Sequence, residues 1–446
     1  MSQNPTMHTT SLCPICLRKL EAYMYEEDKS TYMKKECPEH GEFKTLVWRD
    51  TGTSMQEWIR TKERAHIKNP ITKVEKGCPY DCGLCSAHRQ HTCTALLEVT
   101  KRCNLHCQFC FADALGQTQD PSLEQIRFQF ETIFRVSGKC NIQLSGGEPT
   151  MRDDLPKIVA LAASFGFPFI QVNTNGIRLA QDERYLKSLK EAGLHSVFLQ
   201  FDGTDDKIYK ALRGKALFEL KKEVIQNCQK HGIGVVLVPT LVPKINIYNI
   251  GDIVRFGMQH SPTVRGVHFQ PVSYFGRIPK EPSHEDRITL PEVMHHIYEQ
   301  TDKMVSLESM QPPGCENSLC SFNGNYLVED GVLKPISKRS CCTSQPSSAT
   351  EGANKAKAFV ARNWSYQKQV QEEKLSDWDK ILESIQNRTF CLSGMAFQDV
   401  WNVNLERIRD CCIHVSTLDG RLIPFCMYNL TNKDGVSLYR DNVAER

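Results

Sequence analysis

Cys103, Cys107 and Cys110 form a C-x3-C-x2-C array, and Phe109 immediately precedes the last cysteine. Three thiolates at this spacing can ligate three irons of a cubane [4Fe-4S] cluster and leave the fourth iron without a protein ligand. A substrate or cosubstrate can bind to that fourth iron. This segment, named the Cys103 array below, therefore indicates a catalytic iron-sulfur centre.

A second group of candidate ligands lies near the N-terminus, where Cys13 and Cys16 are followed about twenty residues later by Cys37 and His40. Two short ligand pairs separated by a stretch that can form a hairpin are typical of ribbon and rubredoxin-like modules with a tetrahedral metal. Four protein ligands leave no position for a substrate. We therefore expect this metal, zinc or iron, to stabilise a small N-terminal fold.

Cys78, Cys82 and Cys85 repeat the C-x3-C-x2-C spacing without the aromatic residue. We interpret this segment, named the Cys78 array below, as an auxiliary [4Fe-4S] site, because cubane ligation commonly uses such short runs. The alternative is a second zinc knuckle. The candidates for a fourth ligand follow directly in the sequence and are Cys93, His88 and His91.

Composition supports metal ligation in a cytoplasmic protein. The chain has 446 residues, 20 cysteines and a formal net charge of +3. It lacks a signal-peptide pattern at its start, a run apolar enough to span a membrane and a dense basic stretch for nucleic acid. The recurrent C-x2-C and C-x3-C-x2-C spacings then favour metal sites over disulfides.

Alternating strand and helix patterns must position these motifs. From residue 94 onward the periodicity predicts six βα units and a parallel sheet, which we expect to form a partial (β/α)6, TIM-like barrel of the α/β class. The predicted strands cover residues 94–99, 141–144, 169–173, 196–201, 235–239 and 266–270, and the predicted helices cover 121–136, 153–164, 182–192, 215–230 and 250–259.

The polar and glycine motifs follow the predicted strands, at the end of a βα barrel where chemistry takes place. The Cys103 array follows the first strand, and paired glycines that permit close backbone approach to a ligand follow the second. A carboxylate beside them can accept hydrogen bonds from an ammonium group. In chain order, the residues at the ends of the second, third and fourth strands are Gly146, Gly147, Glu148, Asn175, Gln200 and Asp202.

The Cys103 array with its aromatic residue, one βα unit before Gly146-Gly147-Glu148-Pro149, resembles the radical S-adenosylmethionine (SAM) superfamily over residues 94–270. This resemblance implies reductive cleavage of SAM at the cluster to a 5′-deoxyadenosyl radical. It also implies SAM-binding roles. The GGE turn would bind the methionine amino group, Asn175 the ribose and carboxylate side, and Phe109 the adenine, with Gln200 and Asp202 as further contacts.

A narrower resemblance covers nearly the whole chain. The segments CPIC, CPEHG, GCPYDCGLCSAHRQHTC, LQFDGT, RGVHFQPVSYFGR and RDCCIHVSTLDGRLIPFC are similar to the group that contains archaeal tetraether lipid synthase and the hydroxymethylpterin dimethyltransferases. Members carry a rubredoxin-like site, a radical cluster and two auxiliary clusters. The resemblance favours iron at the N-terminal site, although His40 departs from an all-cysteine site and leaves zinc open.

The C-terminal part contains further cysteines, and we predict one more cluster from ligands distant in sequence, held by Cys320, Cys411, Cys412 and Cys426. The alternative is that they are core residues. The Ser- and Ala-rich stretch 344–358 is typical of a surface loop. Together these patterns divide the chain into a metal module (1–70), an auxiliary-cluster segment (71–93), the barrel (94–290) and a C-terminal auxiliary-cluster and substrate region (291–446).

Three functions are compatible with the sequence. The first is a radical SAM enzyme that abstracts hydrogen from an unactivated carbon for C–C bond formation on a lipid or other apolar substrate. The second is radical SAM methylation or modification of a pterin, peptide or other polar molecule. The third, a non-catalytic iron-sulfur carrier, leaves the GGE turn unexplained. The cofactors expected are SAM, its [4Fe-4S] cluster, one or two auxiliary clusters and one iron or zinc ion, with ferredoxin or flavodoxin as electron donor.

Overall fold

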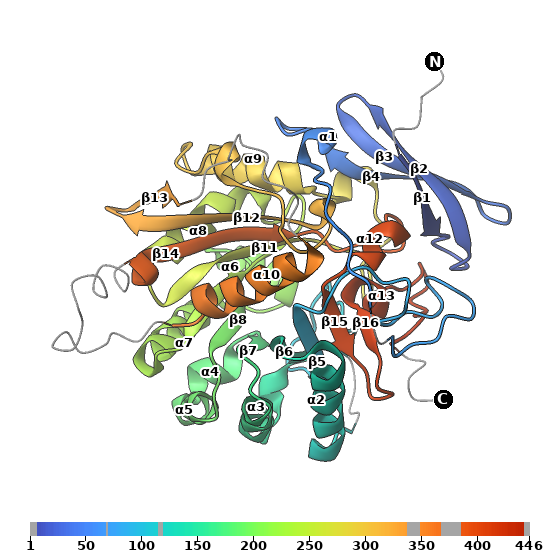
Figure 1. Cartoon of the computed structure of the whole chain (residues 1–446). Helices are drawn as coiled ribbons and strands as arrows, with labels where there is room; N and C mark the ends of the chain where they lie inside the picture. Colours follow the sequence, from blue (N-terminus) through green and yellow to red (C-terminus); the bar gives the residue numbers. More distant parts are fainter. Residues whose placement is uncertain (1–6, 68–69, 115–118, 337–347, 367–384, 441–446) are drawn as a thin grey trace.

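The computed structural model describes residues 7–67, 70–114, 119–336, 348–366 and 385–440 (Figure 1). Its N-terminal part is an antiparallel sheet of β1 (Met7–Leu12), β2 (Lys19–Glu27), β3 (Ser30–Cys37) and β4 (Gly41–Arg49), in that order. Two of its hairpin turns carry the two predicted ligand pairs, one between β1 and β2 and the other between β3 and β4. A sheet of adjacent hairpins thus brings ligands together that are distant in sequence.

The six predicted parallel strands are confirmed. They are β5 (Thr94–Thr100), β6 (Asn141–Gly146), β7 (Ile170–Thr174), β8 (Ser196–Gln200), β9 (Gly234–Val238) and β11 (Val264–Pro271), and they pair in chain order. Their residues are almost all buried and rich in valine, isoleucine and leucine, as a parallel sheet covered on both faces requires. The short β10 (Thr240–Leu241) pairs with β11 beyond the end of β9.

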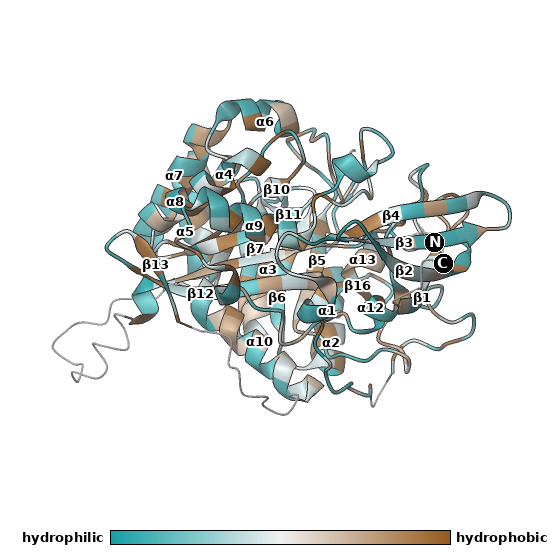
Figure 2. Ribbon diagram, turned by 90° about the horizontal axis from the view of Figure 1, so that it is seen from above, coloured by the Kyte–Doolittle hydropathy of each residue, from teal (hydrophilic) through white to brown (hydrophobic). Residues whose placement is uncertain are grey.

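Helices cover the outer face of this sheet. The five predicted helices are α2 (Leu123–Ser137), α3 (Leu155–Ser164), α5 (Glu183–Glu191), α7 (Phe218–His231) and α8 (Ile250–Gln259), joined by the shorter α4 (Ile177–Gln181) and α6 (Asp206–Arg213). Helix α2 starts with a capping box between Ser122 and Gln125. Figure 2 shows hydrophilic and hydrophobic residues mixed along outer helices such as α5 and α7, as expected where one face packs on the sheet.

The C-terminal residues extend both edges of the same sheet. Strand β14 (Thr389–Met395) pairs parallel to β11, and β15 (Ile413–Ser416) pairs parallel to β5 at the opposite edge. Antiparallel strands then flank these two, namely β12 (Ser321–Glu329), β13 (Val332–Pro335) and β16 (Leu422–Pro424). The proposed boundary between 290 and 291 therefore separates strands of a single sheet, because parallel pairing joins β14 and β15 to the first and last strands of the barrel.

Helix α10 (Ala349–Trp364) corrects the prediction of a surface loop over residues 344–358, of which residues 344–347 lie outside the described part. Ser348 caps the helix by accepting a hydrogen bond from the Glu351 amide, and the alanines in the segment favour helix. Asn363 and Lys357 of α10 bond through their carbonyls to Arg265 and Asn141, which lie at the start of β11 and β6. Helix α10 therefore closes the end of the barrel where the parallel strands begin, and Figure 1 shows it in front of β8 and β11.

Four further α-helices pack around the two sheets, and hydrogen bonds to the segment around one of them hold the N-terminal ribbon in place. They are α1 (Met55–Trp58), α9 (Leu290–Gln300), α12 (Leu405–Arg409) and α13 (Phe425–Asn429). The buried Lys35 of β3 donates to the carbonyl of Val400 at 2.8 Å, and Thr9 of β1 donates to Asn404, the N-cap of α12, at 2.7 Å. Among the described residues, the helices are all too short or too polar to cross a membrane.

Candidate active site and metal centres

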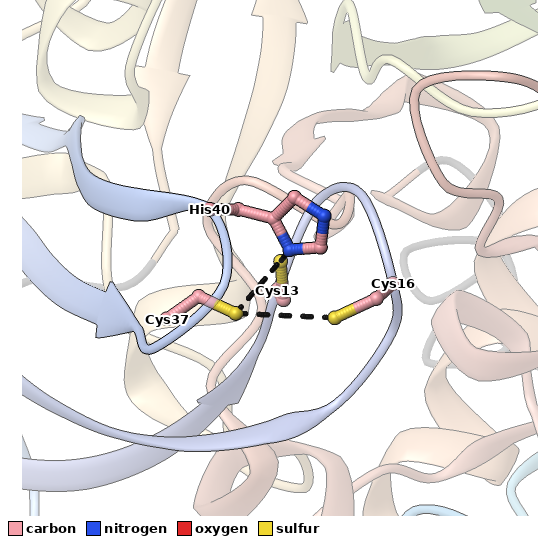
Figure 3. A group of neighbouring side chains, drawn as sticks. All are labelled: Cys13, Cys16, Cys37 and His40. Carbon is pink, nitrogen blue, oxygen red and sulfur yellow. Dashed lines mark hydrogen bonds between the residues drawn. The ribbon is translucent and has the colours of Figure 1, made fainter.

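Cys13, Cys16, Cys37 and His40, named the ribbon site below, gather at one end of the N-terminal sheet (Figure 3). The Cys37 sulfur lies 3.4 Å from His40 Nδ1 and 3.9 Å from the Cys16 sulfur. Sulfurs held about 2.3 Å from one tetrahedral ion are separated by roughly 3.8 Å, so this spacing fits a single metal ion. Burial opposes ionisation of Cys37, but hydrogen bonds from the Glu39 backbone and His40 outweigh it and lower its pKa to about 6.

The Cys103 array lies in the loop after β5, at the end of the barrel where the parallel strands finish. The loop after β11 holds it in place. Cys110 and Arg277 exchange two backbone hydrogen bonds of 3.1 and 3.0 Å, and Arg277 Nε donates to the Cys107 carbonyl at 3.0 Å. Burial raises the pKa of Cys103 to about 11, so iron must displace a proton from this thiol.

The geometry of the Cys103 array fits a cluster better than a single ion. Within the described chain, its three thiols do not form a group as compact as the ribbon site, whose ligand atoms all lie within 4.8 Å of one another. A cluster several atoms across needs wider spacing. All three cysteines also line a cavity inside the barrel, so an iron held here has access to bound molecules.

The glycine turn after β6 packs directly on the strand that leads into the Cys103 array. A Cβ atom on Gly146 would lie 2.2 Å from the Thr100 carbonyl oxygen, and one on Gly147 would lie 2.2 Å from that of Arg102. The Gly147 amide donates to Thr100 at 2.8 Å, and the Glu148 amide donates to Arg102 at 2.7 Å. Only glycine permits this approach, which fixes the position of the turn relative to the cysteines.

Glu148 and Asn175 join three strand ends. Glu148 is buried and accepts hydrogen bonds from the hydroxyls of Thr150 and Thr174 and from the Asn175 amide, at 2.6 to 2.7 Å. The Asn175 side chain donates in turn to Asn104 within the Cys103 array at 2.7 Å. Most of the hydrogen-bonding capacity of both side chains is therefore used to align the strand ends, although both residues also line the cavity.

Asp202 corrects one prediction, because its carboxylate is engaged within the protein. It is fully buried and pairs bidentately with Arg213 of α6, with both N–O distances at 2.7 Å. Asp202 does not line the cavity, whereas Arg213 does. The aspartate therefore positions a guanidinium at the cavity wall and is itself not available to SAM. Gln200 and Phe109 line the cavity, as expected for contacts with a ligand.

The cavity has a volume of about 610 Å³ and passes through the barrel. Its lining includes the Cys103 array and the GGE turn where the parallel strands finish, and residues of α10 where they begin. Four side-chain amides in this lining carry an oxygen that is buried and has no hydrogen-bond partner among the described residues. They are Asn141, Asn173, Gln200 and Asn325.

The Cys78 array also lies in a loop, and Cys411 is within electrostatic range of it. A hydrogen bond with Cys82 lowers the pKa of Cys78 to about 7, and the charges of Cys85 and Cys411 reach Cys82. The side chains of the three predicted fourth ligands have other partners. His88 Nε2 contacts the Cys411 carbonyl at 2.8 Å and His414, His91 contacts Thr350, and Cys93 belongs to the group described next.

Cys93, Cys315 and Cys412, named the basal trio below, gather at the closed end of the cavity. The Cys93 and Cys315 sulfurs are 2.8 Å apart, and all three ligand atoms lie within 4.8 Å. Cys93 directly precedes β5 and Cys412 directly precedes β15, so the pairing of these strands brings them together. The hydrogen bond with Cys315, together with burial, raises the pKa of Cys412 well above its usual value.

The sequence predicted that Cys412 shares a cluster with Cys320, Cys411 and Cys426. The structure corrects this prediction, because Cys412 belongs to the basal trio. Cys411 lies within electrostatic range of Cys320 and Cys426, so these three remain neighbours. Adjacent residues in extended chain point to opposite sides, and Cys411 and Cys412 therefore serve two different groups. The adjacency of Cys411 and Cys412 in the sequence was therefore an indication that they belong to different groups. Cys315, by contrast, has no neighbouring cysteine motif and was not predicted as a ligand.

Comparisons with known proteins agree with the fold and the site. Residues 97–257 match the radical SAM superfamily, and residues 6–49 match the HMPTM N-terminal zinc ribbon domain. The zinc ribbon match favours zinc over iron at the ribbon site. These findings and the Cys103 array define a radical SAM enzyme with an N-terminal zinc ribbon.

The whole chain is similar to one curated enzyme. A 7,8-dihydro-6-hydroxymethylpterin dimethyltransferase from Methanocaldococcus jannaschii is 36% identical, and the alignment covers 98% of this chain and 95% of that enzyme. The chain belongs to the family of that dimethyltransferase. A probable GTP 3′,8-cyclase from Methanothermobacter marburgensis is 27% identical over 62% of this chain and 87% of its own. The crystal structure of Streptococcus suis SuiB aligns with 49% of this chain and 47% of its own, at 15% identity and a TM-score of 0.40.

Proposed function

We propose that this protein is a radical SAM enzyme that methylates a pterin, with 7,8-dihydro-6-hydroxymethylpterin as its substrate. The relative that covers nearly the whole chain acts on this pterin, according to its name. The proposal takes up the second of the three functions compatible with the sequence. The relative that covers nearly the whole chain favours it over coupling of lipid chains, because its name states methyl transfer to a pterin.

The cavity supplies the observation that carries the proposal. Four of the amides in its lining have a buried oxygen without a partner. An unpaired buried acceptor costs about 1–3 kcal/mol, and a rotation of the terminal amide is enough to turn the oxygen toward a ligand. A dihydropterin carries several N–H groups that can donate to such oxygens. A hydrocarbon chain carries none, so a lipid would leave the cost unrelieved.

The protein's residues have distinct roles in this proposal. Cys103, Cys107 and Cys110 would hold the [4Fe-4S] cluster, which supplies the radical chemistry when SAM is bound to it. The GGE turn and Asn175 would position SAM, and Arg213 presents a positive charge to the cavity wall. The barrel and α10 exclude water from the cavity, which protects a reactive intermediate.

Two further cysteine groups are candidates for metal sites. The Cys78 array with Cys411 provides four thiols for an auxiliary cluster. The ligand atoms of the basal trio all lie within 4.8 Å of one another, as in the ribbon site, so the trio is a candidate for a single metal ion. A low-potential donor such as ferredoxin or flavodoxin would supply electrons.

The direct test is activity on the named substrate. Anaerobically reconstituted protein receives dithionite, excess SAM and 7,8-dihydro-6-hydroxymethylpterin. One SAM would be cleaved to methionine and 5′-deoxyadenosine, whose radical precursor takes a hydrogen atom from the pterin. A second SAM would donate the methyl group and leave as S-adenosylhomocysteine, with dithionite as the source of electrons. Mass spectrometry follows 5′-deoxyadenosine, S-adenosylhomocysteine and methylated pterin. A Cys107→Ala variant is the control, and we expect it to form none of these products. If the wild-type protein releases 5′-deoxyadenosine but leaves the pterin unmethylated, the radical SAM assignment stands and the pterin substrate is wrong.

A further inference from the structure

Three aromatic side chains meet in the lower half of the cavity, toward the end that α10 closes. Phe198 of β8 lies nearly parallel to Trp364 of α10, with ring centroids 5.7 Å apart and planes inclined by 28°. His268 of β11 lies 5.5 Å from Phe198 and 5.9 Å from Trp364. All three line the cavity and form what we call the ring bay. Flat surfaces of this kind favour a flat ligand.

The polar groups of the ring bay are neutral. The His268 Nδ1 atom is 2.8 Å from the Ser393 hydroxyl. Burial lowers the pKa of His268 to about 4, so the imidazole carries no charge near neutral pH. A neutral imidazole and a hydroxyl can bond to a heterocycle without the charge that a phosphate or carboxylate would require.

Asn325 of β12 adds an acceptor to this wall. In the sheet it stands opposite Cys391 of β14, which is two residues before Ser393, the partner of His268. Side chains two residues apart in a strand point to the same side of the sheet. Asn325 is therefore on the same side of the sheet as Ser393 and is its diagonal neighbour on the adjacent strand. Its Oδ1 atom is buried without a partner within the described residues. Buried acceptors are normally hydrogen-bonded, so we expect a bound ligand to donate a hydrogen bond to this oxygen.

These features match one chemical class. The aminopyrimidinone ring of a pterin is flat and uncharged, and N–H donors line one of its edges. We propose that this ring stacks on the cavity-facing side of the Phe198–Trp364 pair and that Asn325 Oδ1 accepts a hydrogen bond from one of its N–H groups. Asn325 is then a specificity-determining residue for the substrate. This inference rests on the proposed function and adds the location and the contacts of the ring.

The assignment predicts how substitutions change substrate binding. The dissociation constant for 7,8-dihydro-6-hydroxymethylpterin is measured on the reconstituted holoenzyme, without reductant. We expect Asn325→Leu to weaken binding about tenfold, because it removes the acceptor. Asn325→Asp keeps acceptor oxygens at the same place and should stay within about threefold of wild type. Phe198→Leu removes the stacking surface and should weaken binding about tenfold.

Phe134→Leu is the matched control for the aromatic change, because Phe134 is exposed on α2 and lies outside the cavity lining. We expect it to bind the pterin as wild type does. Iron and zinc contents and circular dichroism identify any variant that fails to fold. If Asn325→Leu does not fold, Asn325→Asp replaces it as the test, because it has nearly the same shape as the wild-type side chain and keeps the acceptor oxygens. Binding by Asn325→Asp more than about threefold weaker than wild type would then contradict the assignment. Equal affinities of wild type, Asn325→Leu and Phe198→Leu would overturn the assignment.

The same measurement separates this inference from the proposed function. If wild type does not bind the dihydropterin, the substrate proposal fails, and the ring bay is tested with guanine and 2-aminopyrimidin-4-one. Binding of either that is weakened by Asn325→Leu supports a bay for flat donor-bearing rings. Absence of binding for all three molecules overturns the ring bay as well.

Discussion

The ribbon site and the Cys103 array use the same kind of ligand in opposite ways. The ribbon site surrounds its metal position with four side chains from two hairpin turns, away from the cavity. The Cys103 array offers three thiols from one loop, and all three line the cavity. A full set of protein ligands produces a structural metal, and an incomplete set beside a cavity produces a reactive one.

The sharpest test of this contrast removes one thiol of the array. We expect Cys103→Ala to reduce 5′-deoxyadenosine formation to background, because two thiolates do not retain the cluster. Zinc content, measured by elemental analysis of the same sample, should be unchanged. Simultaneous loss of zinc would show that the two sites are not independent.

Gly147→Ala tests whether the GGE turn must touch the strand before the array. The new Cβ would lie 2.2 Å from the Arg102 carbonyl oxygen, so the turn must move. We expect SAM affinity, measured by equilibrium dialysis, to fall at least about tenfold. An Ala substitution at Gly435, where a Cβ meets no atom within 4 Å but φ is positive, is the control for backbone strain outside the GGE turn. Unchanged SAM affinity in Gly147→Ala would contradict the role of the turn.

Asp202→Asn removes the charge that holds Arg213 at the cavity wall. Breaking one partner of a buried ion pair costs about 3–5 kcal/mol, so the thermal unfolding midpoint should fall clearly. We expect 5′-deoxyadenosine formation by the protein that remains folded to fall several-fold, because the guanidinium loses its orientation. Asp205→Asn, at the exposed N-cap of α6, is a control on the same segment. Wild-type activity in Asp202→Asn would show that Arg213 needs no such support.

Cys37→Ser removes one ligand of the ribbon site. The variant should lose zinc and unfold at a lower temperature, because a ribbon this small depends on its metal. The specific rate of 5′-deoxyadenosine formation, corrected for iron content and measured well below the unfolding midpoint, should remain within about twofold of wild type. A complete loss of activity would mean that the ribbon contributes to the reaction itself.

The smallest effect is expected for His40→Cys, which exchanges one zinc ligand for another. Four-cysteine and three-cysteine-one-histidine sites are both tetrahedral and both closed. Zinc content and 5′-deoxyadenosine formation should therefore match wild type. Replacement of zinc by iron in this variant, detected by elemental analysis, would show that His40 selects the metal.

The same contrast explains what could be predicted from the sequence. The Cys103 array, the Cys78 array and the ribbon site consist of closely spaced ligands, and local spacing was enough to find them. The six strands were predicted because short segments with apolar residues alternate with segments of helical periodicity. The basal trio was missed because Cys93, Cys315 and Cys412 are joined only by the pairing of β15 with β5 and by the path of the chain near α10.

Two other differences have local causes. Asp202 was predicted as a SAM contact from its place at a strand end, but Arg213 eleven residues later takes up both carboxylate oxygens. A charge partner of this kind leaves no pattern in the sequence. The 344–358 stretch was predicted as a loop because serines dominate its start, whereas the alanines that follow favour the helix α10.

The pairing of β14 and β15 with opposite edges of the barrel has a consequence for biosynthesis. Strand β15 begins at Ile413 and pairs with β5, which begins at Thr94, so the pairing must await nearly the entire polypeptide. The barrel edge at β5 is therefore covered, and the basal thiols are brought together, only after β15 has been synthesised and has paired with β5. Contacts between segments this distant in sequence form late in folding, so the basal trio is assembled after the local helix and strand units of the barrel.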